Sequence, residues 1–273
     1  MSGDIDGLYV RARRVLLDVL EALRDQLDAV ILVGAQAIYL HAGEANLTVA
    51  PFTTDADLAL DPRALLSDPK LADAMAAGGF IPSPNVNMIG TWISRREGVE
   101  VDLMVPEAVG GAGRRAARLG LHGNQVARKT RGLEAALADK RVLVIASLEG
   151  ADSRRFEIAV AGPAALLIAK LHKLEERHQD AGRRSDKDAL DVYRLLVATT
   201  DEDLARAFQL LLTDPIAGEV TRQALGYLGT LFGLPEANGS QMAARAAYPL
   251  MDFAEVAASC AVLAQELLEQ VQV

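Results

Sequence analysis

The sequence predicts an α+β protein in which a small mixed sheet flanked by helices is followed by a helical C-terminal domain. Two observations support this fold class. Up to about residue 161, short β-rich apolar runs alternate with segments of helical spacing, whereas after Pro163 the helical spacing of apolar residues continues almost to the end of the chain. We therefore expect a sheet domain at residues 1–161 and a helical domain at residues 162–273.

Helices and strands alternate in the expected sheet domain. Apolar residues at i, i+3 and i+4 predict an opening helix over about residues 7–26, and the apolar run Ala29–Val33 predicts a buried strand that ends at Gly34. A short helix is expected from Gly34 to about His41, and another over Pro62–Ala77 with proline in its first turn. Further strands, each short and bounded by glycine, proline or charge, are expected at Ala56–Leu60, Met88–Arg95, Val99–Val105, Val142–Ala146 and Phe156–Val160.

The expected helical domain is strongly acidic. Breaks in its helical pattern are predicted near Gly182, Thr199, Pro215, Gly233 and Gly239. Residues 195–273 carry ten acidic residues, three arginines and no lysine, which accounts for most of the formal charge of −9. The preceding part of the chain is therefore almost neutral. Because electric fields act locally, the acidity of the whole protein does not exclude a polyanionic ligand.

The composition is that of an ordinary soluble globular protein, because 51% of the 273 residues are hydrophobic and 24% are charged. The longest uncharged apolar stretches are well short of the roughly 18 to 20 residues that span a bilayer, so no membrane partner is expected. The acidic N-terminus has no signal-peptide pattern. Cys260 is the single cysteine, which excludes intrachain disulfides and multi-cysteine zinc sites and favours a cytoplasmic location.

Three aspartates are candidates for a metal site. Asp55 and Asp57 enter a predicted strand at positions i and i+2, so their carboxylates point to the same face. Two carboxylates this close repel each other unless a cation lies between them, and oxygen ligands suit Mg²⁺. Asp102 lies in the largely apolar strand Val99–Val105 and joins the other two if the strands pair. The alternative is that these acids are solvated at strand ends or cap a helix.

A glycine turn precedes these acids. The segment Ile31–Ala37 has the pattern of a strand, a turn at Gly34 and the start of a helix. Such a turn allows backbone N–H groups to approach a phosphate, and the helix N-terminus adds partial positive charge. Glycine at a strand-to-helix turn also has a purely steric explanation.

A cationic stripe is expected on the first helix after Pro163. Lys170, Lys173 and Arg177 recur at i, i+3 and i+7. The stem of Lys170 lies among leucines, so this lysine needs an anionic partner. Asp188 and Asp191, one turn apart on the next helix, face the same side. The alternative is that these aspartates merely form surface ion pairs with charged neighbours on their own helix.

A basic segment lies between Glu107 and Glu134, where no acidic residue occurs. Its cationic residues are Arg114, Arg115, Arg118, Arg128, Lys129 and Arg131. Clustered cations attract a polyanion such as RNA within about a Debye length. The alternative is a solvated loop with scattered arginines.

Read in order, these motifs form a recognisable set: Gly34-Ala35, Thr53-x-Asp55-x-Asp57, Asp102, Lys170-Leu-His-x-x-x-x-Arg177 and Lys187-Asp188-x-x-Asp191. The set resembles the nucleotidyltransferase-fold toxins of the AbiEii/AbiGii type, which include the MenT toxins and share the fold of DNA polymerase beta-type nucleotidyltransferases. The resemblance covers about residues 15–196.

The resemblance implies an enzyme that transfers a nucleoside monophosphate from an NTP to an acceptor hydroxyl, with Mg²⁺ or Mn²⁺ as cofactor. By position in the motif, Asp55 and Asp57 would hold the metal and the triphosphate. Asp102 would be the third carboxylate, which binds the metal or takes a proton from the acceptor hydroxyl. Such metal-assisted displacement stabilises both the attacking oxygen and the pyrophosphate leaving group.

The same resemblance implies roles for the second group of residues. Lys170 would neutralise phosphate charge, and Asp188 or Asp191 would position Lys170 or the nucleotide, so these three join the catalytic set. The implied nucleotide-binding residues are Gly34, Ala35, Thr54, Lys173 and Arg177.

The acceptor and the partners are inferred from the resemblance and from the basic segment. The resemblance and the basic segment favour RNA, especially the 3′ end of tRNA, and the toxin resemblance implies a cognate antitoxin in a toxin-antitoxin or phage-defence pair. A protein side chain or a small-molecule hydroxyl would use the same catalytic core. The competing hypothesis is a catalytically inert module of the same fold that binds nucleotide, RNA or a partner protein.

Overall fold

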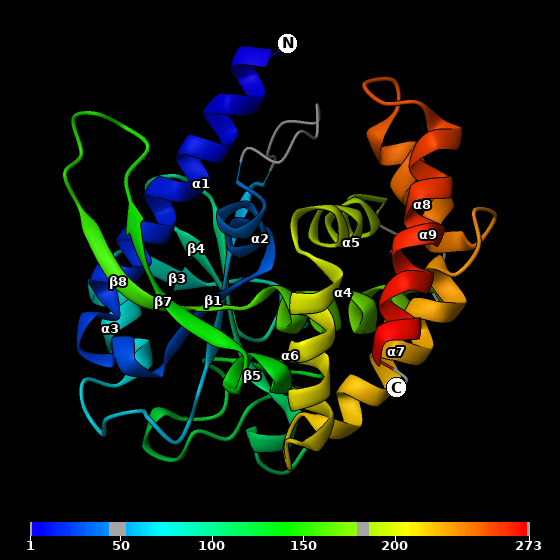
Figure 1. The fold of residues 1–273 in the computed structure, drawn as a ribbon. Helices are drawn as coiled ribbons and strands as arrows, with labels where there is room; N and C mark the ends of the chain where they lie inside the picture. Colours follow the sequence, from blue (N-terminus) through cyan, green and yellow to red (C-terminus); the bar gives the residue numbers. More distant parts are fainter. Residues whose placement is uncertain (1, 44–52, 179–185, 272–273) are drawn as a thin grey trace. The chain divides into compact units, whose positions relative to one another are not determined.

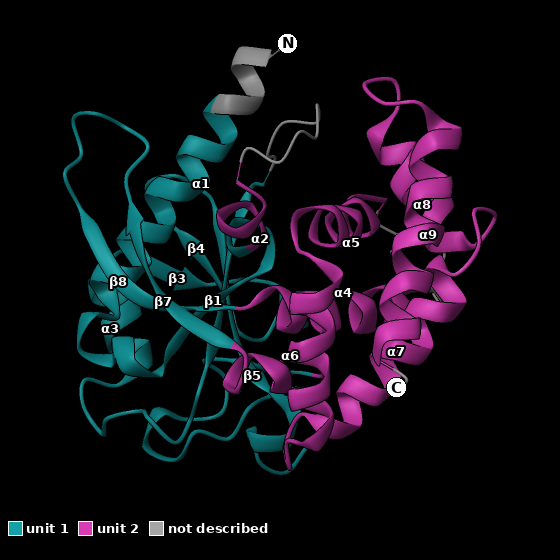
Figure 2. Ribbon diagram, viewed as in Figure 1, with its two compact units in different colours: residues 1–37, 51–130, 140–161 teal, residues 38–50, 131–139, 162–273 magenta. Residues whose placement is uncertain are grey.

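A computed structural model describes residues 2–43, 53–178 and 186–271 (Figure 1). It confirms the expected α+β class, with a mixed eight-stranded sheet and a helical C-terminal region. The chain forms two units (Figure 2). Unit 1 comprises residues 1–37, 51–130 and 140–161, and unit 2 comprises residues 38–50, 131–139 and 162–273. The sheet lies in unit 1, and the C-terminal helices lie in unit 2.

The strands of unit 1 are β1 (Val30–Val33), β2 (Asp55–Leu60), β3 (Phe80–Pro82), β4 (Thr91–Ser94), β5 (Glu100–Pro106), β6 (Arg128–Thr130), β7 (Lys140–Ala146) and β8 (Arg155–Ala161). Their order is β3-β4-β5-β2-β1-β8-β7, and β6 pairs with β5 off this path. β2 runs antiparallel to β1 and parallel to β5, so the sheet is mixed. The two strands that carry the predicted acids are therefore direct neighbours.

Helices pack on this sheet. α1 (Ser2–Ala22) contacts β2, β5 and β8, and it also contacts α3 (Leu71–Ala77). The apolar positions predicted for the opening helix are fully buried: Val15, Leu16, Val19 and Leu20 in α1, and Leu23 directly after it. A 3₁₀ helix (Arg24–Ala29) leads into β1, and α2 (Gly34–Ala42) follows β1 directly. Short 3₁₀ helices are also present at Glu107–Val109, Gly120–His122 and, in unit 2, Glu134–Leu137.

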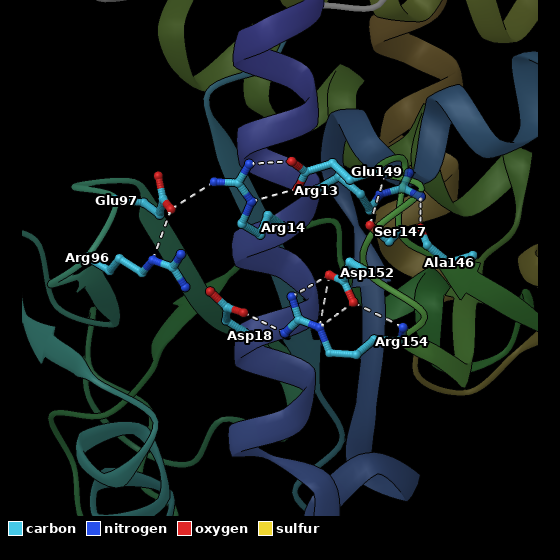
Figure 3. Close-up of polar contacts among 10 residues, drawn as sticks. All are labelled: Arg13, Arg14, Asp18, Arg96, Glu97, Ala146, Ser147, Glu149, Asp152 and Arg154. Carbon is cyan, nitrogen blue, oxygen red and sulfur yellow. Dashed lines mark hydrogen bonds and ion pairs between the residues drawn. The ribbon is translucent and has the colours of Figure 1, made fainter.

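Ion pairs tie α1 to two loops of unit 1 (Figure 3). Arg14 donates hydrogen bonds to Glu149 at 2.6 and 2.7 Å and to Glu97 at 3.0 Å. Arg154 binds Asp18 of α1 at 2.5 Å. Because Glu97 lies between β4 and β5 while Glu149 and Arg154 lie between β7 and β8, these pairs connect α1 to both turns.

The helix expected over Pro62–Ala77 is wrong in its first half, because α3 begins only at Leu71. The Gln26 amide pairs with the backbone N–H and carbonyl of Leu66 and donates to the carbonyl of Pro69. Pro69 has no N–H to donate, and its ring disfavours helical geometry in the preceding residue. The segment therefore obtains its hydrogen bonds from a side chain in another element and remains a loop.

Other element boundaries also differ from the prediction. β3 and β6 are not predicted, because three residues are too few to show alternation. The strand expected at Met88–Arg95 is shortened to β4, and the opening helix spans Ser2–Ala22 instead of residues 7–26. The gap between α7 and α8 precedes Gly239, which lies in the first turn of α8. Gly182 lies outside the described residues.

Unit 2 is built from α4 (Pro163–His178), α5 (Asp186–Ala198), α6 (Asp201–Thr213), α7 (Gly218–Phe232), α8 (Asn238–Ala247) and α9 (Phe253–Val271). Helix α9 contacts α6, α7 and α8, while α4 contacts α5 and α7. Phe208, Phe232 and Cys260 are fully buried in this bundle, and burial raises the pKa of the Cys260 thiol to about 12. Across the described ranges, no helix combines the length and the apolar character needed to span a bilayer.

Candidate active site

Four carboxylates gather on one face of β2 and β5, which we call the acidic strand face. The parallel register places Asp55 opposite Glu100 and Asp57 opposite Asp102. Since side chains alternate along each strand, all four project to the same side of the sheet. The alternate residues of β2, Ala56 and the two leucines that follow, are fully buried on the other side. The pairing of the two acidic strands, on which the meeting of the three aspartates depends, is present, and Glu100 is a fourth acid that the prediction did not include.

Asp102 is held by two side chains from neighbouring strands. Thr91 Oγ1 on β4 donates to Asp102 Oδ1 at 2.6 Å, and Arg128 Nη1 on β6 lies 2.7 Å from Asp102 Oδ2. Both carboxylate oxygens thus have partners within unit 1, one neutral and one charged. The ion pair is partly solvent-exposed, with exposed fractions of 34% for the Arg128 side chain and 22% for the Asp102 side chain.

The remaining acids lie in a crowded negative environment. Thr53 is fully buried, and its hydroxyl donates to Asp55 Oδ1 at 2.5 Å. Partial burial, and then the neighbouring Asp102 and Asp55, raise the pKa of Glu100 above its ordinary value. A cation bound beside these acids would lower the pKa of Glu100 again.

Gly34 lies directly against this face, at the start of α2. Its φ is +69°, and a Cβ added there would lie 2.0 Å from Asp57 Oδ2. Glycine is therefore required both by the left-handed backbone and by the approach of the Asp57 carboxylate. The backbone N–H groups of Gly34 and Ala35 open α2 at this same point. Predicted site residues from two motifs, the glycine turn and the double aspartate, are thus brought together.

Buried polar side chains fix the start of β2. Gln36 Nε2 donates to the backbone carbonyls of Asp55 and Ala12, both at 3.2 Å. Arg13 on α1 donates in turn to Gln36 Oε1 at 2.9 Å, and both side chains are buried. The position of the double-aspartate strand is therefore coupled to α1 and α2 through two residues that the sequence analysis did not single out.

The acidic strand face fits a divalent cation in part. Asp55 and Asp57 supply the oxygen donors that Mg²⁺ prefers, on one face and next to further negative charge. Asp102 directs its oxygens to Thr91 and Arg128 instead. Within residues 2–43, 53–178 and 186–271, no group of three or more His, Cys, Asp or Glu side chains is arranged to hold a metal ion.

The second group of predicted residues forms a buried charge cluster in unit 2, which we call the lysine cluster. Lys170 Nζ on α4 donates to Asp188 Oδ1 at 2.7 Å and to Asp191 Oδ2 at 2.8 Å. All three side chains are at least nine-tenths buried. Burial alone would lower the pKa of Lys170, but Asp188 and Asp191 outweigh it and hold that pKa above its ordinary value. The expected anionic partner of Lys170 is thus confirmed.

Further cations complete the lysine cluster. Lys173 and Arg177 reach Asp188 at 3.0 and 2.8 Å, and Arg194 reaches Asp191 at 3.2 Å. Burial would raise the pKa of Asp188, but Lys170 and then Lys173 lower it well below its ordinary value. The interpretation of these aspartates as mere surface ion pairs is wrong, because Asp188, Asp191 and Arg194 are all buried.

Residues of the basic segment divide into two kinds. Arg128 is paired with Asp102, Lys129 donates to loop carbonyls including that of Gly111 at 3.0 Å, and Arg131 binds Glu219 at 2.8 Å. The other three, Arg114, Arg115 and Arg118, lie in the loop before β6 and are exposed. Thr54, a predicted nucleotide-binding residue, is also exposed.

Residues 14–215 match the nucleotidyltransferase family. The chain belongs to that family. This nucleotidyltransferase is therefore a transferase of phosphorus-containing groups, and membership implies transfer of a nucleoside monophosphate from an NTP substrate. The match spans the glycine turn, all four acids of the acidic strand face and the lysine cluster. Searches of curated proteins and of solved structures found no match.

Three residues at the acidic strand face of this nucleotidyltransferase, namely Glu100, Arg128 and Thr91, were not identified as site residues by the sequence analysis. Glu100 was detectable, because it lies two positions before Asp102 in the same predicted strand and so shares its face. Arg128 was noted only as part of a basic segment, since its pairing with Asp102 depends on the unpredicted β6. Thr91 carried no sequence signal beyond its place at the start of a strand.

Proposed function

We propose that this nucleotidyltransferase uses Mg²⁺, with Mn²⁺ as a substitute, to transfer a nucleoside monophosphate from an NTP to a hydroxyl of RNA, with the 3′ end of tRNA as the expected acceptor. The proposal includes a biological role as the toxin of a toxin-antitoxin or phage-defence pair, with a cognate antitoxin as partner. Family membership supports the chemistry, and the sequence resemblance to AbiEii-type toxins supports the acceptor and the role.

One observation carries the proposed site, namely the register that sets Asp57 opposite Asp102 while Gly34 lies against the Asp57 carboxylate. Asp55 and Asp57 would hold the divalent cation. When bound there, the cation supplies charge stabilisation for the attacking and leaving oxygens. Asp102 would be the third ligand or would accept the proton of the acceptor hydroxyl. The acceptor oxygen bonds to the α-phosphorus while the bond to pyrophosphate breaks.

The other predicted site residues would bind the phosphates of the NTP or neutralise their charge. The backbone N–H groups at Gly34 and Ala35 and the hydroxyl of Thr54 would donate to phosphate oxygens. Lys170 would neutralise phosphate charge, with Asp188 and Asp191 as its positioning residues. Lys173 and Arg177 would add to this charge, and their side chains are more exposed than that of Lys170.

A transfer assay tests the proposal. The full chain is incubated with each labelled NTP, Mg²⁺ and total RNA, and RNA, protein and small products are resolved separately. We expect label in RNA of tRNA size, no label with EDTA, and recovery with Mn²⁺. Asp57→Asn should lower the rate by about 10² or more, because a group that stabilises transition-state charge is lost. Asp73→Asn, an exposed acid on α3, should leave it unchanged.

Different outcomes point to different revisions. Label in protein or in a small product would replace RNA as the acceptor and leave the chemistry in place. Failure of transfer with every NTP and every acceptor class would favour the inert module that binds nucleotide, RNA or a partner protein. A fully active Asp57→Asn variant would contradict the proposed site.

A further inference from the structure

The Arg128 guanidinium binds the carboxylate of Asp102, and it would have to move away before a metal ion could bind the same oxygen. Arg128 Nη1 binds Asp102 Oδ2 at 2.7 Å, and its other amino group donates to the Met104 sulfur at 3.3 Å. Met104 is both the register partner of Arg128 and two positions from Asp102, so it projects to the same side as Asp102. The Arg128 side chain therefore lies along the acidic strand face.

The backbone around Gly90 builds this arrangement. Leu103 N donates to Gly90 O at 2.8 Å, and a Cβ on Gly90 would lie 2.5 Å from Arg128 N and 2.6 Å from Leu103 O. Only glycine leaves room for β6 to approach here, and its φ of +81° favours glycine as well. Thr91, the next residue, binds the other oxygen of Asp102. Two independent elements thus converge on one carboxylate.

We propose that Arg128 is the resident counter-ion of Asp102 and competes with a divalent cation for that carboxylate. This inference rests on the proposed function, because it assumes that the acidic strand face binds a divalent cation. Asp102 then becomes a metal ligand only when Arg128 releases it, whereas Thr91 keeps the carboxylate oriented. Arg128 is a positioning residue in this scheme, since it acts on the cation through Asp102.

The physical terms favour exchange over a permanent ion pair. Both partners are partly exposed, and such pairs are weakened by solvent screening. The two amino groups of Arg128 have different partners, Asp102 for one and the Met104 sulfur for the other, so the guanidinium is not devoted to Asp102 alone. A divalent cation brings twice the charge to a face that carries four carboxylates, and Arg128 can swing away without unfolding a buried core.

Metal binding without turnover tests the inference. Mn²⁺ titration calorimetry is performed on the full chain without NTP, for wild type and for Arg128→Gln, which keeps most of the side-chain stem over Met104. We expect Arg128→Gln to bind Mn²⁺ about two- to fivefold more tightly, because a weak competing ion pair is removed. Arg128→Lys, which retains a competing cation, should stay near wild type.

A matched control separates competition from general electrostatics. Arg118→Ala removes one positive charge from the exposed loop before β6, and we expect it to change Mn²⁺ affinity by much less. Equal tightening by Arg118→Ala and Arg128→Gln would overturn the proposal. So would an unchanged or weaker Mn²⁺ affinity in an Arg128→Gln variant whose Tm and circular dichroism match those of wild type.

The proposed function can fail separately. If the affinity gain of Arg128→Gln is lost when Asp102→Asn is added, the counter-ion role stands, whatever the transfer assay shows. If the wild type transfers nucleotide but Arg128→Gln shows no gain in Mn²⁺ affinity, the counter-ion role is overturned while nucleotidyl transfer stands. An unfolded Arg128→Gln protein would be replaced by Arg128→Met, which preserves the apolar stem and carries the same expectation.

Discussion

Gly34 is the residue at which backbone geometry and the acidic strand face depend on each other most directly. Gly34→Ala should combine left-handed strain of about 1–2 kcal/mol with a clash against the Asp57 carboxylate. Because Asp57 must move, we expect transfer activity to fall at least about tenfold. We also expect most of the rise in Tm that Mn²⁺ produces to be lost. Activity and a Tm titration check this expectation.

The control for Gly34 is Gly98, in the turn between β4 and β5. Its φ is +66°, close to that of Gly34, but an added Cβ would meet no atom within 4 Å. Gly98→Ala should therefore show the backbone strain alone, with activity retained. Equal loss of activity in both variants would mean that strain, and not the approach of Asp57, explains the glycine.

Among the single substitutions considered, replacement of Lys170 should lower the free energy of unfolding the most. Lys170→Met leaves Asp188 and Asp191 buried without their shared partner, and breaking a buried ion pair in this way costs about 3–5 kcal/mol. Urea denaturation measures the loss. Because such a loss alone can remove activity, the catalytic role of Lys170 must be measured at a temperature where the variant is folded. Adding Asp188→Asn should recover part of the stability.

Asp188 also predicts how stability depends on pH. Its pKa is lowered in the folded state, so its contribution is fully present above the unfolded value of about 4 and is lost as pH falls below it. The wild type should therefore lose stability in acid more steeply than Asp188→Asn. Asp186→Asn is the control, because Asp186 on the same helix is more exposed and pairs with the exposed Arg245. An acid limb that Asp188→Asn leaves unchanged would contradict the assignment.

At the scale of elements, two adjacent arginines connect α1 to the rest of unit 1 in different ways. Arg13 is buried, and its guanidinium donates to Gln36, to the carbonyl of Ala146 and to the hydroxyl of Tyr9. Arg14 makes the partly exposed pairs with Glu97 and Glu149 that appear in Figure 3. One arginine thus supports the strand that begins at the acids, and the other secures surface turns.

Alanine at these two positions should have unequal effects. Arg13→Ala leaves buried acceptors without a donor, which costs about 1–3 kcal/mol for each group. Arg14→Ala should cost less, and the cost should shrink at high salt, because exposed pairs are screened. Chemical denaturation at low and high salt distinguishes the two. A larger loss for Arg14→Ala would show that the surface pairs, and not the Gln36 contact, hold α1 in place.

At the scale of the whole molecule, charge decides how an RNA acceptor would bind. The chain carries a net −9, so RNA binding requires a local cationic surface and should weaken steeply with salt. The exposed arginines for this role are Arg114, Arg115 and Arg118, because Arg128, Lys129 and Arg131 contact other groups of the protein. Replacing the three exposed arginines by alanine should flatten the salt slope of RNA affinity by about two units.

This variant should retain NTP binding, since the acids remain. The control removes the same charge from elsewhere in unit 1, through alanine at Arg95, Arg96 and Arg155, all of which are exposed. RNA affinity measured from low to moderate salt compares the two triple variants. Equal slopes would mean that net charge alone governs binding and that the loop before β6 is not a contact surface.

The sequence by itself determined those features that depend on local periodicity. Alternation placed Asp55 and Asp57 on one face, helical spacing identified α1 and the C-terminal helices, and the position of Lys170 among leucines predicted its anionic partner. Each of these features depends on residues a few positions apart, where strand and helix geometry fix the direction of a side chain.

Tertiary structure alone decided which distant segments meet. The register of β2 on β5, the pairing of Arg128 with Asp102 and the approach of Asp57 to Gly34 join residues far apart in sequence. The loop before α3 was mispredicted as helix for the same reason, since its hydrogen bonds come from Gln26 on another element. No local pattern encodes such contacts, because they arise only when packed elements bring their side chains and backbones within hydrogen-bond distance.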